Sequence, residues 1–238
     1  MRDCVKCSEP GGRHENEDFA GFSESRGNLI AVLADGLGGQ GDGQIASQTV
    51  GTSLLKCGAD GAFPTKQTIE DAFDVANRLL LSKQTNKYHM KTTAVYFCQQ
   101  GARAVWAHIG DSRLYHIYKD EVVHFTLDHS ASQMSVLMGD ITRDQIPSDP
   151  GRSRLFRAMG VDGATPDIHE PIELPPGRHA FLLCSDGLWE YLSDAEIIDI
   201  IHREMSAQRC LDFLVDCKIF KSPDDCDNYS AVLILLEV

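Results

Sequence analysis

The chain has 238 residues, enough for one large domain or two small ones. Its formal net charge of −13 argues against nucleic acid or an anionic membrane as the main partner, because both recruit basic surfaces. No stretch approaches the roughly 18 unbroken apolar residues of a membrane helix, and the polar residues 1–12 carry no apolar secretion segment. We therefore expect a cytoplasmic protein, and nothing in the sequence demands more than a monomer.

The first half of the chain combines one apolar run with two helical patterns. Residues 28–34 predict a buried strand that ends at Asp35, and the glycine-rich stretch 36–41 that follows suits neither helix nor strand. Two amphipathic helices are predicted next, over 43–56 and 68–83. Their expected buried faces are Ile45, Thr49, Thr52 and Leu55 in the first, and Ile69, Phe73, Ala76 and Leu80 in the second.

The second half begins with short segments rich in β-branched and aromatic residues. Turns divide them into 92–99, 102–109, 112–118 and 121–126, which predicts an antiparallel meander. A polar, irregular region over 130–160 follows, with a helix expected at 131–138. The remaining elements are a strand at 179–184, helices at about 193–204 and 206–219, and a strand at 229–237.

This order of elements favours an α+β protein over an alternating β-α-β chain. The helix pairs within 43–83 and 193–219 can cover opposite outer faces of two packed antiparallel sheets. We therefore predict a four-layer α-β-β-α sandwich.

The eight cysteines occur mostly in apolar contexts, so we expect buried reduced thiols rather than disulfides. Cys4 and Cys7 have the spacing of half a zinc site, but no second Cys or His pair completes one.

Carboxylates recur at the ends of the predicted strands. Asp35-Gly36 and Asp186-Gly187 each follow an apolar strand, whereas Glu17-Asp18 and Asp227-Asn228 each precede a strand. Gathered carboxylates repel one another and resist ionisation unless cations lie between them. Hard oxygen ligands suit Mg²⁺ or Mn²⁺, and a glycine after the aspartate lets its carbonyl approach an ion closely.

The carboxylates Glu17, Asp35, Asp186 and Asp227 would together neutralise two divalent ions. Two ions roughly 4 Å apart can share a bridging water and lower its pKa, which makes hydroxide available as a nucleophile. The plainer alternative is that each Asp-Gly pair is only a turn, as we expect for Asp60-Gly61 and Asp162-Gly163.

From Arg13 to the C-terminus, an ordered series of short motifs resembles the metal-dependent Ser/Thr protein phosphatases of type 2C, the PPM family, in their compact bacterial form. The motifs are Arg13-x-x-Asn16-Glu17-Asp18, residues 32–39, Thr92-Thr93, residues 109–113, 126–130, 157–160 and 183–188, and Asp227-Asn228. Each motif alone is weak, but all of them in this order are specific.

The resemblance implies a role for each matching residue. Asp35 would bridge two ions and the Gly36 carbonyl would bind one of them, while Asp186 and Asp227 hold the other. Glu17 would bind metal directly or through water, and Asp18 would orient metal-bound waters.

Three further roles follow from the same resemblance. Asp111 resembles a ligand that shares a third, weaker ion with Asp186. Arg13 would grip the substrate phosphate through its planar guanidinium, and Asn228 would support the site by hydrogen bonding.

The implied activity is hydrolysis of phosphoserine or phosphothreonine by a metal-bridging hydroxide, with two Mn²⁺ or Mg²⁺ ions and room for a third. The implied partners are a phosphorylated protein and a Ser/Thr kinase that the enzyme opposes in bacterial signalling. Residues 1–12 would form a flexible segment and 13–238 a single phosphatase domain, with a flap at about 130–160 beside the site.

Two alternatives stay open. A non-enzymatic regulator could keep the fold, although such proteins lose metal ligands and the four carboxylates are present here. A hydrolase of small phosphate esters would carry the same site residues. The general acid is also open, because Leu37 stands where eukaryotic relatives carry a histidine and only His14 and His129 lie nearby in the sequence.

Overall fold

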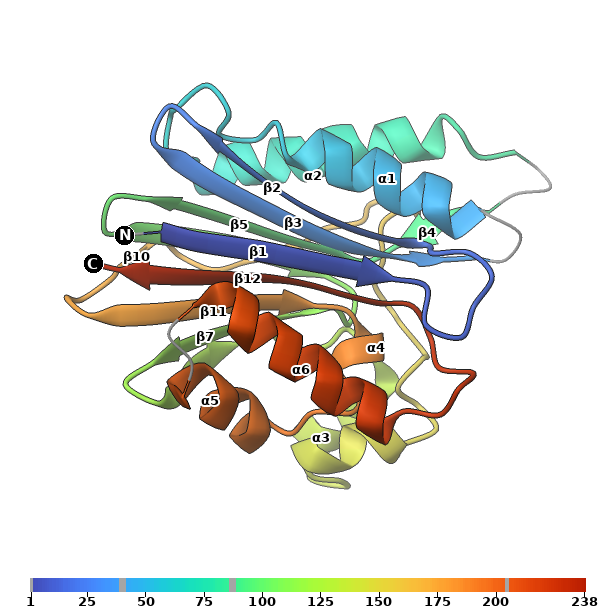
Figure 1. Cartoon of the computed structure of the whole chain (residues 1–238). Helices are drawn as coiled ribbons and strands as arrows, with labels where there is room; N and C mark the ends of the chain where they lie inside the picture. Colours follow the sequence, from blue (N-terminus) through green and yellow to red (C-terminus); the bar gives the residue numbers. More distant parts are fainter. Residues whose placement is uncertain (1, 39–41, 86–88, 204–205) are drawn as a thin grey trace.

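The computed structural model describes residues 2–38, 42–85, 89–203 and 206–238, and it consists of two antiparallel sheets packed face to face (Figure 1). The first sheet has the order β1 (Arg2–Glu9), β12 (Tyr229–Glu237), β11 (Arg178–Cys184), β7 (Arg113–Tyr118), β8 (Glu121–Phe125). The second has the order β10 (Ile172–Glu173), β6 (Arg103–Ile109), β5 (Ala94–Gln100), β3 (Asn28–Leu37), β2 (Asp18–Ser25), with β4 (Lys91–Thr92) beside β3 and β9 (Asp167–Ile168) beside β6.

The apolar run at 28–34 is continuous because both faces of β3 are buried. Leu29, Ala31 and Leu33 point between the sheets, where they belong to the same core as Phe181 of β11. The alternate residue Ile30 belongs to the core under the helices. Alternation in a strand normally separates a polar face from an apolar one, so a run without alternation indicates a central strand covered on both sides.

Helices cover both outer faces, so the predicted α-β-β-α layering and the α+β class are confirmed (Figure 1). Helices α1 (Asp42–Leu54) and α2 (Lys66–Leu81) lie on the second sheet, and α5 (Asp194–Arg203) and α6 (Ala207–Lys221) lie on the first. The predicted buried face of α2 is confirmed in full, since Ile69, Phe73, Ala76 and Leu80 are all buried.

The predicted buried face of α1 is wrong. Ile45 is 43% exposed, and the helix instead buries Gly43, Ala46, Ser47, Val50, Gly51 and Leu54. The reason is close packing, because a Cβ on Gly51 would lie 2.1 Å from the ring of Phe19. The pattern of large apolar residues predicted the wrong buried face because small residues form this contact.

The expectation of a flexible segment over 1–12 is wrong for Arg2–Glu9. These residues form β1 and pair along their whole length with β12, from Arg2 opposite Leu236 to Glu9 opposite Tyr229. The strand lies at the edge of its sheet and is mostly half-buried, so its sequence shows no apolar run. Its Cys4 packs in the core between the sheets and Cys7 in the core under α6, so the two thiols face opposite sides and form no zinc pair.

The predicted meander is divided between the sheets. Strands β5 and β6 pair in the second sheet, whereas β7 and β8 pair in the first, and the chain crosses between them at residues 110–112. The crossing places Asp111 between the two sheets at one end of both. The signals for strands are local, and they cannot show that one connection changes sheet.

The segment between β8 and β9 carries α3 (Ala131–Met138) and the 3₁₀ helix η1 (Arg143–Ser148). The helix predicted at 131–138 is confirmed, and the Ser130 hydroxyl caps it by accepting from the Gln133 N–H. The short helix α4 (Asp186–Trp189) follows β11 directly.

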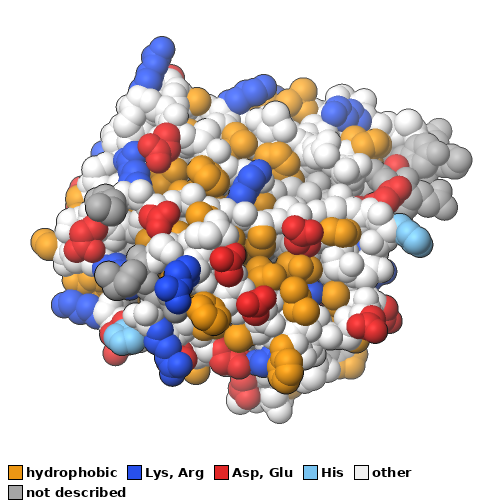
Figure 2. Space-filling view, in the orientation of Figure 1, with side chains coloured by type: hydrophobic (Ala, Val, Ile, Leu, Met, Phe, Trp, Pro, Cys, Tyr) orange, Lys and Arg blue, Asp and Glu red, His pale blue; other side chains and the backbone are white. Residues whose placement is uncertain are grey.

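The structure also shows how surface charge is distributed and in which state the cysteines are. On the face shown in Figure 2, acidic and basic side chains are interspersed, so the net charge of −13 is not gathered there in one patch. All eight cysteines are free thiols. Among the residues described, no helix combines the length and apolar character that crossing a membrane requires.

Candidate metal centre

One cavity collects the predicted site residues from both sheets. It has a volume of about 500 Å³ and lies at the end of the molecule where β3 ends and where α4 and β12 begin (Figure 1). Its lining includes Arg13, Glu17, Asp35, Gly36, Asp186, Asp227 and Asn228. Two predicted residues, Asp18 and Asp111, are buried beside it rather than in its wall. We call Glu17, Asp18, Asp35, Asp111, Asp186 and Asp227 the acidic centre.

The backbone of Asp35 is fixed by a pair of threonines on the neighbouring chain segment. The Thr93 hydroxyl accepts from the Asp35 N–H at 2.9 Å, and the Thr93 N–H donates to the Asp35 carbonyl at 2.9 Å. The Thr92 hydroxyl donates to that carbonyl at 2.8 Å. These bonds hold Asp35 at the end of β3, directly opposite Asp18 of β2.

Glu17 and Gly36 meet at the start of α1. The Gly43 N–H in the first turn of the helix donates to Oε1 of Glu17 at 3.3 Å, where the positive end of the helix dipole favours a carboxylate. The Gly36 N–H donates to the Glu17 carbonyl at 3.2 Å. A Cβ on Gly36 would lie 2.2 Å from the Gly43 carbonyl oxygen, so only glycine permits this approach.

Asp18 is a buried carboxylate that hydrogen bonds satisfy only in part. Its Oδ2 accepts from the Ser185 hydroxyl at 2.9 Å, but its Oδ1 is buried without a hydrogen-bond partner among the described residues. Burial, together with the charges of Asp186 and Asp227, raises the pKa of Asp18 to about 7, against the opposing effect of the serine hydrogen bonds. A buried oxygen without a donor is a position that a cation or its bound water can satisfy.

The pKa values of three other aspartates in the acidic centre are raised as well. Burial raises the pKa of Asp35 well above its ordinary value, and the charges of Asp18, Asp186 and Asp111 add to this effect. Burial and nearby carboxylates likewise raise the pKa of Asp111 and of Asp186. Within the described chain, neither Lys nor Arg forms an ion pair with these four aspartates.

The donor set therefore fits hard divalent cations, because positive charge stabilises the ionised form of so many carboxylates gathered around one cavity. The side chains surround a cavity rather than converge on one point. In the described part of the chain, one trio of side chains has ligand atoms all within 4.8 Å of one another, and it is His108, His129 and Asp167, outside the acidic centre. The wider spacing of the acidic centre suits two ions that keep several waters.

Asn228 and Arg13 complete the wall of the cavity. Oδ1 of Asn228 accepts from the Glu17 N–H at 2.8 Å, next to the proposed ligand Asp227. Nη2 of Arg13 lies 3.2 Å from Oδ2 of Asp227, and both side chains are more than half exposed. The guanidinium can therefore turn from Asp227 towards an anion in the cavity at little cost.

Sequence reasoning missed the side chains that support the acidic centre. Ser185 lies inside the motif at 183–188 and holds Asp18, and Thr92 and Thr93 form a motif to which the sequence assigns no role. Ser153 brings the segment between β8 and β9 to the cavity wall, and no sequence signal pointed to it. Of the two histidines considered as acids, His14 lines the cavity, whereas His129 is buried and holds the Gly110 N–H and Asp167.

Comparison with known proteins agrees with this geometry. A family model described as protein phosphatase 2C matches residues 12–213, which is most of the chain. The chain belongs to the protein phosphatase 2C family. The predicted resemblance and the enzyme class, a phosphoprotein phosphatase, are thereby confirmed.

Curated relatives and solved structures of the same family match nearly the whole chain. A serine/threonine phosphatase of Listeria welshimeri is 28% identical, covering 85% of this chain and 84% of its own. The phosphatase PstP/Ppp of Mycobacterium tuberculosis superposes with a TM-score of 0.88 at 28% identity, covering 100% and 99% of the two chains. A structure of the PstP catalytic domain in complex with two manganese ions superposes with a TM-score of 0.84 at 25% identity, covering 99% of each chain.

Proposed function

We propose that this phosphatase hydrolyses phosphoserine and phosphothreonine in proteins at the acidic centre, with two Mn²⁺ or Mg²⁺ ions. The observation that carries the proposal is the group of buried and half-buried aspartates whose pKa values are raised by loss of solvation and mutual repulsion and which have no Lys or Arg partner among the described residues. The two manganese ions of the related PstP structure support the same number of ions here.

Each side chain has a distinct task in this proposal. Asp35 shares the cavity wall with Glu17, Gly36, Asp186 and Asp227 and would contact both ions, with Glu17 and the Gly36 carbonyl as ligands of one ion and Asp186 and Asp227 as ligands of the other. Asp18, fixed by Ser185, would orient bound waters. Asp111 would add a ligand for a third ion beside Asp186.

When bound, the ions supply the activation of a water for attack on phosphorus and the neutralisation of charge on the phosphate oxygens. The protein supplies the remaining parts. Arg13, at the exposed rim, would bind two phosphate oxygens through its planar guanidinium. Because the acidic centre provides the nucleophile from water, no serine or cysteine need form a covalent bond with the phosphoryl group.

We also propose the cellular setting that the sequence suggested. Residues 13–238 would act as a single domain with a flap at about 130–160, in a cytoplasmic monomer that opposes a Ser/Thr kinase. Ser153 supports a role of the flap in substrate choice, because it lies in the wall of the same cavity as the carboxylates.

The decisive experiment measures hydrolysis of a phosphothreonine peptide and of p-nitrophenyl phosphate with Mn²⁺, Mg²⁺ or a chelator. We expect no activity with chelator. Asp35→Asn and Asp186→Asn should each lower kcat by roughly 10²-fold or more, because each removes a negative charge that would bind the two metal ions. Asp60→Asn is the matched control, since Asp60 lies in an exposed turn. Full activity of both centre variants would refute the proposal.

Two further measurements separate the alternatives. Calorimetry that detects no Mn²⁺ binding to the wild-type protein would favour a non-enzymatic regulator. A rate on small phosphate esters that greatly exceeds the rate on phosphopeptides would favour a small-molecule hydrolase.

A further inference from the structure

A second, smaller cavity lies far from the acidic centre in chemical character. It has a volume of about 180 Å³ and is lined by three histidines, His108, His124 and His169, together with Trp106 and Asp167. Its position is specific, because β8 ends at Phe125 and β9 begins at Asp167. His124 and His169 therefore flank the two ends of the segment 126–166, which contains the flap.

Hydrogen bonds leave a ring nitrogen available in each of the three histidines. His108 Nε2 lies 2.8 Å from the Leu127 carbonyl oxygen, and His169 Nδ1 lies 2.8 Å from the Glu170 carbonyl oxygen. A carbonyl only accepts, so these nitrogens carry the protons, and the lone pairs lie on His108 Nδ1 and His169 Nε2. A ring nitrogen that donates to a backbone carbonyl is the usual second contact of a metal-binding histidine.

The third histidine, His124, makes no hydrogen bond with any residue in the described part of the chain. Its ring lies close to that of His169, with 4.4 Å between the centroids. Burial lowers the pKa of His108 and of His124 to about 4, helped by His129 and His169 respectively. Both rings are thus neutral near pH 7, which is the form that binds metal.

The indole of Trp106 gives the cavity a rigid and incompletely satisfied wall. It stacks on His169 with 4.2 Å between centroids, and it lies 4.9 Å from His124. Its Nε1 is buried without a hydrogen-bond partner among the described residues. A donor left unsatisfied at such a position is costly, and a water or an ion-bound ligand in the cavity could satisfy it.

The neighbouring trio of His108, His129 and Asp167 is a poorer site, although its ligand atoms lie within 4.8 Å of one another. His129 Nδ1 accepts from the Gly110 N–H at 3.0 Å, so the proton is on Nε2, which faces Asp167. Arg157 Nη1 lies 2.5 Å from Asp167 and 3.3 Å from His129 Nε2. A guanidinium already occupies the position that a cation would take.

We propose that His108, His124 and His169 bind a divalent transition metal that prefers nitrogen ligands, such as Zn²⁺ or Cu²⁺. The site is separate from the acidic centre, whose oxygen ligands suit Mg²⁺ and Mn²⁺. An ion here would join β6 and β8 to the residue after β9, and so hold both ends of the flap segment together. The proposal does not depend on the reaction that the acidic centre performs.

The test uses the whole chain, treated with chelator, exchanged into excess Mg²⁺ to occupy the oxygen ligands, and titrated with Cu²⁺ at pH 7. We expect electron paramagnetic resonance to show hyperfine coupling to at least two imidazole nitrogens at the first equivalent. His124→Phe and His169→Phe keep an aromatic ring against Trp106 but remove the ligands, and each should weaken Zn²⁺ binding by at least tenfold.

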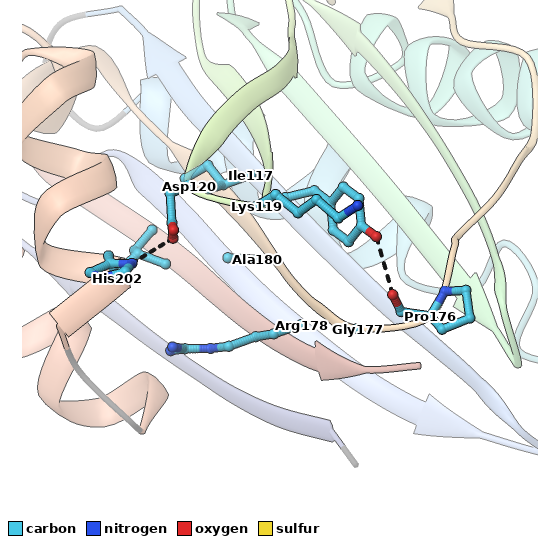
Figure 3. A pocket seen from close by; sticks show the side chains of 10 residues that line it. Ile117, Lys119, Asp120, Pro176, Gly177, Arg178, Ala180 and His202 are labelled. Atoms are coloured by element: carbon cyan, nitrogen blue, oxygen red, sulfur yellow. Dashed lines mark hydrogen bonds and ion pairs between the residues drawn. The ribbon is translucent and has the colours of Figure 1, made fainter.

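Three controls make the result specific. His202→Phe removes a surface histidine whose ring faces Asp120 at 2.6 Å, well apart from the proposed ligands, and it should change nothing (Figure 3). His14→Gln and Asp186→Asn alter the acidic centre and should leave the nitrogen coupling intact. Should a phenylalanine variant fail to fold, as judged by circular dichroism, His169→Gln replaces it. The proposal is overturned if the double variant binds Cu²⁺ with unchanged coupling, or if Asp186→Asn abolishes it.

Discussion

Asn228, at the start of β12, accepts a hydrogen bond at 2.8 Å from the backbone N–H of Glu17, which lies 211 residues earlier in the chain. The same side chain donates to the carbonyls of Pro10 and Glu15, at 2.8 and 2.9 Å. One buried amide thus joins the loop that carries Arg13 and Glu17 to the strand that follows Asp227. The relative position of proposed ligands from both ends of the chain depends on these three bonds.

Asn228→Ala should therefore weaken both the fold and metal binding. Loss of the amide leaves buried backbone groups unsatisfied, which should cost about 1–3 kcal/mol in the free energy of unfolding. Mn²⁺ affinity should fall roughly 10- to 100-fold, as for other residues that position ligands. Urea unfolding in chelator measures the first effect, and calorimetry measures the second.

Asn77→Ala is the matched control for this variant. Asn77 is equally buried, and its amide holds the Gly160 N–H and the Val161 carbonyl outside the cavity. It should lose comparable stability while binding Mn²⁺ as tightly as the wild type. Equal losses of affinity in both variants would show that the effect reflects stability alone.

The second prediction concerns the stability that depends on a buried ion pair near Asp111 of the acidic centre. Arg113 donates from Nε and Nη2 to the two oxygens of Asp128 at 2.8 and 2.7 Å, and its guanidinium stacks 3.5 Å above the ring of Trp189. Arg113→Met leaves a buried carboxylate without a partner, so we expect a loss of about 3–5 kcal/mol in the free energy of unfolding.

The double variant Arg113→Met/Asp128→Leu tests whether the unpaired charge causes this loss. It should be more stable than Arg113→Met alone, because no charge stays buried. Arg78→Met, which removes an exposed i,i+4 partner of Asp74, should cost only about 0.5 kcal/mol. A double variant less stable than either single variant would contradict the argument.

The sequence was informative about elements whose cause is local. The spacing of Ile69, Phe73 and Leu80 predicted the buried face of α2, and the apolar run before Asp35 predicted β3, because burial of large side chains leaves a periodic signal. The same signal failed for α1, whose contact with Phe19 depends on Gly51. It also failed for β1, a half-buried edge strand whose position depends on pairing with the distant β12.

The candidate site divides along similar lines. Asp35 and Asp186 could be predicted because a carboxylate after a buried strand must lie at the end of a sheet. Thr93 and Ser185 could not, because they act by hydrogen bonding to groups that the fold brings from elsewhere. A short polar residue that fixes a backbone looks the same in sequence as one that faces water.

Buried neutral histidines predict that stability falls at acid pH. Burial, followed by the neighbouring His179, His124 and His169, lowers the pKa of His116 to about 3 from 6.5. Between these values the unfolded chain binds more protons than the folded one, so the free energy of unfolding decreases as the pH falls through this window. Each such histidine contributes a slope of at most about 1.4 kcal/mol per pH unit.

His116→Phe should remove part of this slope while it keeps a ring stacked on Phe181. Urea unfolding of the metal-free protein at pH 7, 6 and 5 measures the difference between variant and wild type. This difference matters because the raised pKa values of the acidic centre act in the opposite sense and are common to both proteins. Parallel pH curves for the two proteins would exclude His116 as a cause.

The last prediction concerns the contact between the flap and the helix that begins at Asp186. Arg152 Nη1 lies 3.0 Å from Oε1 of Glu190, the residue that follows α4, and Arg152 Nε donates to the Pro147 carbonyl at 3.1 Å. Burial raises the pKa of Glu190 to about 7, the charge of Asp186 adds to this effect, and Arg152 opposes it. Arg152 therefore opposes protonation of Glu190 and holds the flap beside the cavity wall that Ser153 lines.

Arg152→Ala should loosen the flap without changing the acidic centre. We expect KM for a phosphopeptide to rise roughly fivefold, the equivalent of about 1 kcal/mol for a half-buried pair, because the peptide would have to order the flap on binding. KM for p-nitrophenyl phosphate should change little, and limited proteolysis should cut the flap faster. Arg154→Ala removes an exposed charge from the same segment and should alter neither quantity. Arg152→Ala removes the ion pair with Glu190, whereas Arg154→Ala removes only a surface charge. Equal effects of both variants on KM would mean that the charge of the flap, rather than its contact with Glu190, determines how the peptide binds.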